Sequence, residues 1–224
     1  MGPVIYQYTY RDALRDGVIV PFALKNIVFD LEEDRQEEYD KLTKAISRSI
    51  HMRGVEDDKT IALLLRRARI LNLSLNRIRL ALRIVASHQG QRIIIFHEDI
   101  EACEVIMEVL SQANIRAGIY HSRMKLRERA MVLSDYRQGI IDVLVTCRAL
   151  DEGFNVPETQ VGIIAASTAT RRQRIQRLGR VLRPVAGKDQ AVVYTLVATS
   201  PEIQRLREEE KEMDGIAEVS WGRV

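Results

Sequence analysis

From Gln91 onward, short apolar runs alternate with stretches that have helical periodicity. Strands are predicted at 92–96, 116–120, 142–146, 161–165 and 191–197, and helices at 100–113, 125–138, 170–182 and 201–213. Strands that alternate with helices in this way favour a parallel sheet with helices on both faces. In such sheets the chemistry lies on loops at the carboxyl ends of the strands. The sequence therefore predicts a three-layer α/β domain with its functional loops after residues 96, 120, 146 and 165.

The segment before this domain is predicted to be mainly helical. The first thirty residues, punctuated by Gly17 and Pro21, are predicted to hold turns and short strands, and 26–31 resembles a strand. A helix is expected over 34–50, because Tyr39, Leu42, Ile46 and Ile50 fall on one face. Asp34 and Glu37 resemble a capping box. The polar residues 53–58 form a break before the next helical segment.

Residues 59–88 are expected to form one long helix or a broken pair. Apolar residues at alternating spacings of three and four give a short heptad seam, which favours a helix lying on its own domain over a coiled coil. The opposite face is rich in arginine. A solvated face and a phosphate-contact surface both fit these residues: Arg66, Arg67, Arg69, Arg77, Arg79 and Arg83.

Composition excludes several classes of protein. With 46% hydrophobic residues the chain can bury a core, and with 5% aromatics it does not resemble a reader built on base-stacking platforms. Cys103 and Cys147 cannot make a disulfide framework or, without clustered histidines, a metal site. We expect reduced thiols and a cytoplasmic protein, because the sequence shows neither a membrane-spanning run nor a signal peptide.

The sequence lacks the motifs that bind the phosphates of ATP. It contains no G-x-x-x-x-G-K-[ST] run, no G-x-G-x-x-G run and no acidic DExx run after an apolar strand. Gly187-Lys188 is only a pair before a strand, so we interpret it as a turn. This stretch of sequence cannot build a phosphate cradle of that kind by itself.

The densest chemical signal is an arginine-rich predicted helix at 171–183, with six arginines in thirteen residues. Gln176, Arg180 and Arg183 are spaced to project to one side. A row of guanidinium groups suits a polyphosphate or a nucleic-acid backbone, although a solvated basic helix is also consistent. Gly179 favours a functional role, because glycine weakens a helix and suggests close backbone approach.

At this point the sequence resembles the helicases and translocases of superfamily two. The run QRLGRVLR at 176–183 is similar to their motif VI. The runs at 93–98, 120–122 and 145–157 resemble motifs IV, IVa and V, in the family's order. The opening segment, 8–21, resembles the entry to the second motor lobe in the repair and transcription branch of these DNA helicases.

The resemblance implies the second, C-terminal RecA-like lobe of such a motor. It implies three parts: the end of an inter-lobe linker with a helical extension at 1–88, the helicase C-terminal domain at 89–200, and a charged helix and tail at 201–224. ATP and Mg²⁺ would be bound mainly by an N-terminal RecA-like lobe. The other partner would be DNA, as a single strand or a fork, although the sequence does not distinguish DNA from RNA. No membrane partner is expected.

The resemblance also implies roles for individual residues at the nucleotide. Arg180 and Arg183 match arginine fingers, which stabilise charge on the γ-phosphate. Gln176 matches the residue near that phosphate and the attacking water. Gly153 and Asn155 match the pair near the ribose, where Asn155 replaces a frequent aspartate by a neutral amide that still donates and accepts hydrogen bonds. Arg177 is grouped with the nucleotide-binding residues.

A second group matches contacts to the nucleic-acid backbone. Thr146, together with His121 and Ser122, corresponds to residues that hold phosphates of the bound strand, while Arg123 and Arg148 lie beside them in sequence. Such contacts position a strand without reading its bases.

The sequence thus predicts the C-terminal motor lobe of an ATP-dependent DNA helicase or translocase, active only as half of a site. One alternative is a stand-alone nucleic-acid-binding or regulatory module that kept the fold without catalysis. Another keeps the motor but assigns it to RNA or to a restriction system. The intact row formed by Gln176, Arg180 and Arg183 favours the motor.

Overall fold

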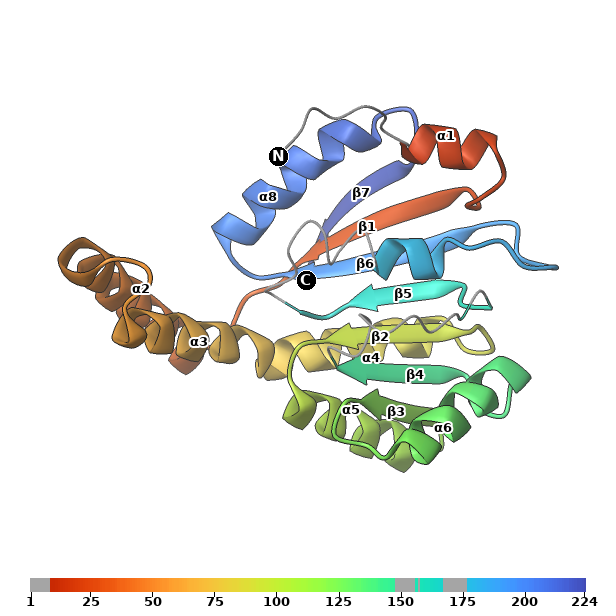
Figure 1. The fold of residues 1–224 in the computed structure, drawn as a ribbon, viewed down its shortest axis with the longest axis horizontal. Coiled ribbons are helices and arrows are strands. Elements are labelled where there is room, and N and C mark those ends of the chain that lie inside the picture. Colours follow the sequence, from red (N-terminus) through yellow and green to blue (C-terminus); the bar gives the residue numbers. More distant parts are fainter. Residues whose placement is uncertain (1–8, 148–155, 157, 167–176) are drawn as a thin grey trace.

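A single parallel sheet organises the chain (Figure 1). The computed structural model describes residues 9–147, 156, 158–166 and 177–224. The seven strands lie in the order β3-β4-β2-β5-β6-β1-β7, and every neighbouring pair is parallel. Their bounds are β1 Phe22–Val28, β2 Ile93–His97, β3 Ala117–His121, β4 Val143–Cys147, β5 Val161–Ile164, β6 Ala191–Val197 and β7 Glu218–Arg223.

Helices cover both faces of this sheet, which confirms the predicted α/β class. The named helices are α1 Tyr10–Arg15, α2 Glu33–Arg53, α3 Asp58–Asn72, α4 Leu75–Ser87, α5 Ile100–Gln112, α6 Leu126–Gln138 and α8 Ser200–Glu210, followed by the 3-10 turn η2 Lys211–Met213. Residues 177–181 are also helical. Gly139 ends α6 in the left-handed conformation with φ 82°, as the sequence predicts.

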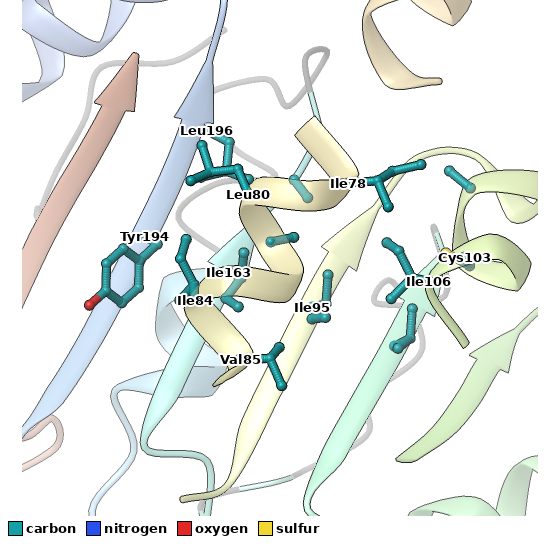
Figure 2. Packing of buried hydrophobic residues seen from close by; sticks show 14 of the residues in the cluster. Ile78, Leu80, Ile84, Val85, Ile95, Cys103, Ile106, Ile163, Tyr194 and Leu196 are labelled. Atoms are coloured by element: carbon teal, nitrogen blue, oxygen red, sulfur yellow. The ribbon is translucent and has the colours of Figure 1, made fainter. Parts of the chain in front are cut away.

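Two apolar cores lie on opposite faces of the sheet. On one face, α4 and α5 pack over β2, β4 and β5, with Ile84, Ile95 and Ile106 among the buried residues (Figure 2). On the other face, α1, α6 and residues 177–181 bury side chains such as Tyr136 and Leu178. The central strands read as continuous apolar runs because both of their faces are covered.

The helical extension forms a hairpin of α2 and α3 that projects from the domain (Figure 1). Tyr39, Leu42 and Ile46 are buried as predicted, but Ile50 is exposed. The expected capping box at Asp34 is wrong: α2 begins after Glu32, which makes no side-chain cap.

The segment 59–88 is a broken pair of helices. Ser74 separates α3 from α4, because its hydroxyl accepts from the backbone N–H of Arg77 and caps the second helix. Leu75, in the middle of the predicted heptad seam, is exposed. The seam is therefore interrupted, and α4 lies on its own sheet, as the sequence favours.

The arginine-rich face of this segment is largely engaged within the chain. Arg77 is fully buried, and its Nη2 donates to Glu202 Oε1 at 3.2 Å while its Nη1 donates to the Leu196 carbonyl. Arg66 pairs with Glu38, and Arg69 pairs with Glu101. The solvated reading fits most of this face, since Arg66, Arg69, Arg79 and Arg83 are exposed, and Arg77 departs from it because its side chain is buried.

Two elements were not predicted. The helix α1 lies in a segment expected to hold turns, and its capping box joins Thr9 to Asp12. The strand β7, in the predicted charged tail, pairs with β1 at the edge of the sheet. Both cysteines are free and buried, as expected, and no helix in the described parts of the chain has the length and apolarity needed to span a bilayer.

Candidate nucleotide and nucleic-acid site

The carboxyl ends of β3, β4 and β2 lie side by side. The register aligns His121 with Cys147 and Cys147 with His97, so the three strands end together. The loops that follow them therefore leave the sheet at one edge. This is the edge on which the sequence placed the functional loops.

One residue earlier, Tyr120, Thr146 and Phe96 form a row across the same three strands. All three side chains are buried, so this row belongs to the packed face of the sheet that also holds Leu178. The Thr146 hydroxyl has no hydrogen-bond partner among the described residues. Buried hydroxyl groups usually have one, which distinguishes Thr146 from the apolar side chains around it.

His121, Ser122 and Arg123 form the turn between β3 and α6. The backbone N–H of Met124 donates to the His121 carbonyl at 3.2 Å, and this bond closes the turn. Ser122 and Arg123 are exposed, while His121 is half-buried, and its buried Nδ1 has no partner among the residues that the structure describes. The structure thus brings these three predicted residues to the strand edge beside Thr146.

His97 shapes the turn that follows β2. Its ring is fully buried, and Nδ1 accepts from the backbone N–H groups of Glu98 and Asp99, both at 3.0 Å. Burial lowers the pKa of His97 to about 3, with a smaller contribution from the positive charge of Arg77. A neutral imidazole therefore fixes the backbone at Glu98.

Glu98 in turn holds the segment of motif VI. Its Oε1 accepts from Arg177 Nη2 at 2.5 Å, and both side chains are more than 90% buried. The Arg177 guanidinium also lies over the Phe96 ring, 5.9 Å from the centroid. Phe96 packs in the core and also supports Arg177. The structure places Arg177 inside the domain as an anchor of its helix; nucleotide contact by Arg177 stays a prediction.

A glycine in β5 sets how closely residues 177–181 approach the sheet. A Cβ at Gly162 would lie 2.8 Å from Val181 Cγ2, so only glycine accommodates Val181 at this distance. Gly179 behaves differently from the expectation of close approach, since a Cβ there would meet nothing within 4 Å. Among the described residues, the space beside Gly179 is open.

Lys188 fixes the far end of the same segment. Its buried Nζ donates to the carbonyls of Val181 and Arg183, the latter at 2.9 Å. Burial lowers the pKa of Lys188 to about 8. The predicted turn at Gly187 is confirmed by its φ of +81°. This turn carries a side chain that caps residues 177–183.

The segment 177–183 therefore carries Arg180 in its helical part and Arg183 just after it, on a backbone held by Glu98, Gly162 and Lys188. Arg180 is partly exposed and Arg183 is exposed. Four other predicted site residues lie outside the described residues: Gln176, Gly153, Asn155 and Arg148.

Sequence reasoning missed the three anchors. Glu98 ends the run that resembles motif IV. An acidic residue directly after a buried strand was the one local sign that it could pair with an arginine. Gly162 sits inside a predicted strand, where glycine indicates close approach of another backbone or side chain. Nothing local in the sequence distinguishes Lys188 as a cap. Within the described ranges, no group of three His, Cys, Asp or Glu residues could hold a metal ion.

Several known proteins are similar to this chain in sequence and in fold. Residues 76–185 match the model of the helicase conserved C-terminal domain. A DNA 3'-5' translocase XPB2 from Sulfurisphaera tokodaii is 24% identical over 202 residues, which cover 82% of this chain and 45% of the relative. UvrABC system protein B of Mycoplasma mycoides is 34% identical over 113 residues, covering 47% of this chain and 16% of the relative.

The fold comparison agrees. The Sulfolobus solfataricus SWI2/SNF2 ATPase core domain superposes with a TM-score of 0.63 at 16% identity, covering 87% of this chain and 44% of that structure. Sheet, motif order and family model together define a RecA-like helicase C-terminal domain. The match of residues 76–185 to the helicase conserved C-terminal domain, together with the XPB and UvrABC system protein B relatives, supports a C-terminal superfamily 2 helicase lobe near the repair branch. The chain spans less than half the length of these curated relatives.

Proposed function

We propose that this chain is the C-terminal motor lobe of an ATP-dependent DNA helicase or translocase. The observation that carries the proposal is the anchoring of residues 177–183 by Glu98, Gly162 and Lys188. Three independent anchors hold a short basic segment whose Arg180 and Arg183 reach toward solvent. Preorganised guanidinium groups suit charge that develops during phosphoryl transfer.

In this proposal Arg180 and Arg183 stabilise the γ-phosphate of ATP bound on an N-terminal lobe. The open space beside Gly179 fits close approach of that lobe or its nucleotide. Gln176 would orient the attacking water, and Gly153 with Asn155 would contact the ribose. ATP with Mg²⁺ supplies the free energy for movement, and Mg²⁺ would be held mainly by the other lobe.

The nucleic-acid strand would pass across the carboxyl ends of β3 and β4. The exposed side chains of Ser122 and Arg123, with backbone N–H groups around His121 and Ser122, would donate to phosphate oxygens. Thr146 and Arg148 complete the proposed contact. Phosphate contacts hold the strand without reading its sequence. We assign DNA because the relatives near the repair branch include a DNA translocase.

The decisive experiment compares Arg180→Ala with wild type in the assembled two-lobe protein. ATP turnover stimulated by single-stranded DNA should fall about a thousandfold or more, because an arginine finger has that effect in related NTPases. Affinity for DNA should change little. The matched control is Arg83→Ala, an exposed arginine of α4, which should retain turnover. Full turnover in Arg180→Ala contradicts the assignment.

A second candidate is a stand-alone nucleic-acid-binding module, because the exposed Ser122 and Arg123 at the strand ends could hold phosphates without ATP. It predicts tight DNA binding by the chain alone and no change in the ATP turnover of an added N-terminal lobe. The motor proposal predicts weak binding alone and turnover that requires both lobes. Stimulation by an RNA strand of the same sequence, and not by DNA, would reassign the substrate.

A further inference from the structure

The helical hairpin carries a surface pocket that the motor function does not use. It lies where the last turn of α2 faces the first half of α3, toward the end of the hairpin that projects from the domain (Figure 1). The pocket has a volume of about 520 Å³. Met52 and Arg53 line it from α2, and Lys59, Ala62, Leu63 and Arg66 line it from α3.

The hairpin around this pocket is firmly built, so the pocket is a fixed surface feature. Ser49 and Thr60 share a 2.7 Å hydrogen bond between the helices. Asp57 caps α3 by accepting from two backbone N–H groups, and Gly54 ends α2 with φ 88°. Glu38 and Arg66 bridge the helices nearer to the domain at 2.6 Å.

The pocket combines an apolar surface with a basic rim. Met52 is 75% exposed, an unusual state for a large apolar side chain on a well-packed hairpin. Of the three cations, Arg66 pairs with Glu38, while Arg53 and Lys59 make no ion pair with any described residue. No carboxylate lines the pocket. Glu56, Asp57 and Asp58 lie between Arg53 and Lys59 in the chain but line no part of the pocket, so the cations are the charged groups that face a bound molecule there.

Of the exposed apolar side chains on this hairpin, Met52 lines the pocket. The others lie outside its lining, and helical spacing puts Ile61 and Leu65 on the face of α3 opposite Ala62 and Leu63. The exposed residues outside the lining are Ile50, Val55, Ile61 and Leu65.

We infer that this pocket docks an acidic amphipathic helix of a protein partner. Charge complementarity gives the sign: glutamate or aspartate on the flank of the helix would pair with Arg53 and Lys59. Its apolar face would cover Met52, Ala62 and Leu63, in the manner of helix-in-groove recognition. The stretch from Lys59 to Arg66 spans about 10 Å, or about two helical turns of a bound partner.

A nucleic-acid backbone fits this pocket less well than a peptide does. A phosphate backbone gains nothing from the apolar surface of Met52 and Leu63, and no aromatic side chain lines the pocket to stack a base. The nearby Arg66 and Arg69 are already paired with carboxylates of this chain. The cations that remain are few and flank an apolar centre, which is the pattern of a peptide groove.

The test measures binding of a model peptide to the full chain by fluorescence anisotropy. The probe is a fluorescein-labelled peptide of about 18 residues, roughly five helical turns, with leucine at helical spacing and glutamate elsewhere. One control peptide has the same composition with its leucines dispersed around the helix. A second control replaces each glutamate by lysine. The proposal expects measurable binding of the first peptide only, weakened by added salt.

Two variants locate the binding. Ala62→Glu places a bulky negative group in the pocket at an exposed helical position, and the pair Arg53→Glu with Lys59→Glu reverses the rim. Each should weaken peptide binding by at least about tenfold, because close charge pairs and core contacts dominate such interfaces. The matched control is Arg48→Glu, an exposed arginine of α2 outside the pocket, which should bind within about twofold of wild type. Circular dichroism confirms that each variant is folded.

Several results would overturn the inference. Equal binding of the dispersed-leucine peptide would show unspecific charge attraction. Unchanged binding in both pocket variants would place the peptide elsewhere. Displacement of the peptide by single-stranded or duplex DNA, with DNA affinity lost in the rim variant, would reassign the pocket to nucleic acid. A concentration-dependent dimer abolished by Ala62→Glu in sedimentation would make the occupant a second copy of this chain.

Discussion

Arg177 donates a 2.5 Å hydrogen bond to Glu98 across the interior of the domain, from the helix of motif VI to the turn after β2. The two residues are 79 positions apart in sequence. Both are buried, and the neutral ring of His97 holds the backbone N–H of Glu98. The basic segment that ends in Arg183 is thus tied to the centre of the sheet by an acid at the end of β2.

Breaking this buried pair should strongly destabilise the fold. We expect Glu98→Ala to lower the free energy of unfolding by about 3–5 kcal/mol, because it leaves the Arg177 charge buried and uncompensated. The double variant Glu98→Leu with Arg177→Met should recover most of that loss. Urea unfolding measures both. Glu38→Ala removes the exposed partner of Arg66 and should cost about 1 kcal/mol or less. Equal costs for the two single variants would refute the role given to burial.

A methyl group at Gly162 should push the motif VI helix from the sheet. The added Cβ would lie 2.8 Å from Val181 Cγ2, so Gly162→Ala should cost about 1–3 kcal/mol of stability. Adding Val181→Ala should relieve the clash. Thermal unfolding provides the measurement. Gly179→Ala is the control, because its Cβ meets nothing and alanine favours a helix by up to about 1 kcal/mol. Stability unaffected by Gly162→Ala would contradict the close contact.

His97 should make the fold sensitive to acid. Burial holds the pKa of His97 at about 3 in the folded chain, below its ordinary value of 6.5. The unfolded chain therefore binds a proton near pH 6.5 that the folded chain does not bind until about pH 3. The contribution of His97 to the free energy of unfolding is fully present above pH 6.5. It falls by about 1.4 kcal/mol per pH unit between pH 6.5 and about pH 3.

Replacing His97 tests that assignment. His97→Asn keeps a polar acceptor for the two backbone N–H groups but cannot titrate, so it should flatten the loss of stability between pH 6.5 and 4. His51→Asn changes an exposed histidine of α2 and should leave the profile unaltered. Urea titrations at several pH values give the slopes. An unchanged slope in His97→Asn would assign the acid sensitivity to other groups.

Binding of single-stranded DNA by the chain should be weak and steeply salt-dependent, because the proposed contacts are to phosphates. Arg123→Ala should reduce affinity equally for different base sequences and lower the salt slope by about one. The matched control is Arg127→Ala, which changes the next arginine in the sequence, an exposed residue of α6. Titrations at several salt concentrations give both slopes. A sequence-dependent loss in Arg123→Ala would mean base readout instead of backbone contact.

Local periodicity was sufficient to predict most of the regular elements. The strands between Gln91 and Val197 and the helices between them follow from apolar runs and helical spacing, and Gly139 marks a helix end by its backbone freedom alone. The short helix α1 and the edge strand β7 escaped prediction. Each is short, and β7 is mostly exposed, so neither has the apolar pattern that burial imposes.

The sequence by itself determined the class of fold, the order of the motifs and the arginines of motif VI, because these depend on residue type and spacing along the chain. Tertiary structure decided which charges are engaged. Arg77 and Arg177 read as surface or nucleotide-binding arginines, yet both are buried against carboxylates far away in sequence. The sequence predicted a close contact at Gly179, but in the structure the close contact is made at Gly162. Such pairings form only when the sheet brings distant segments together, so residue spacing along the chain does not predict them.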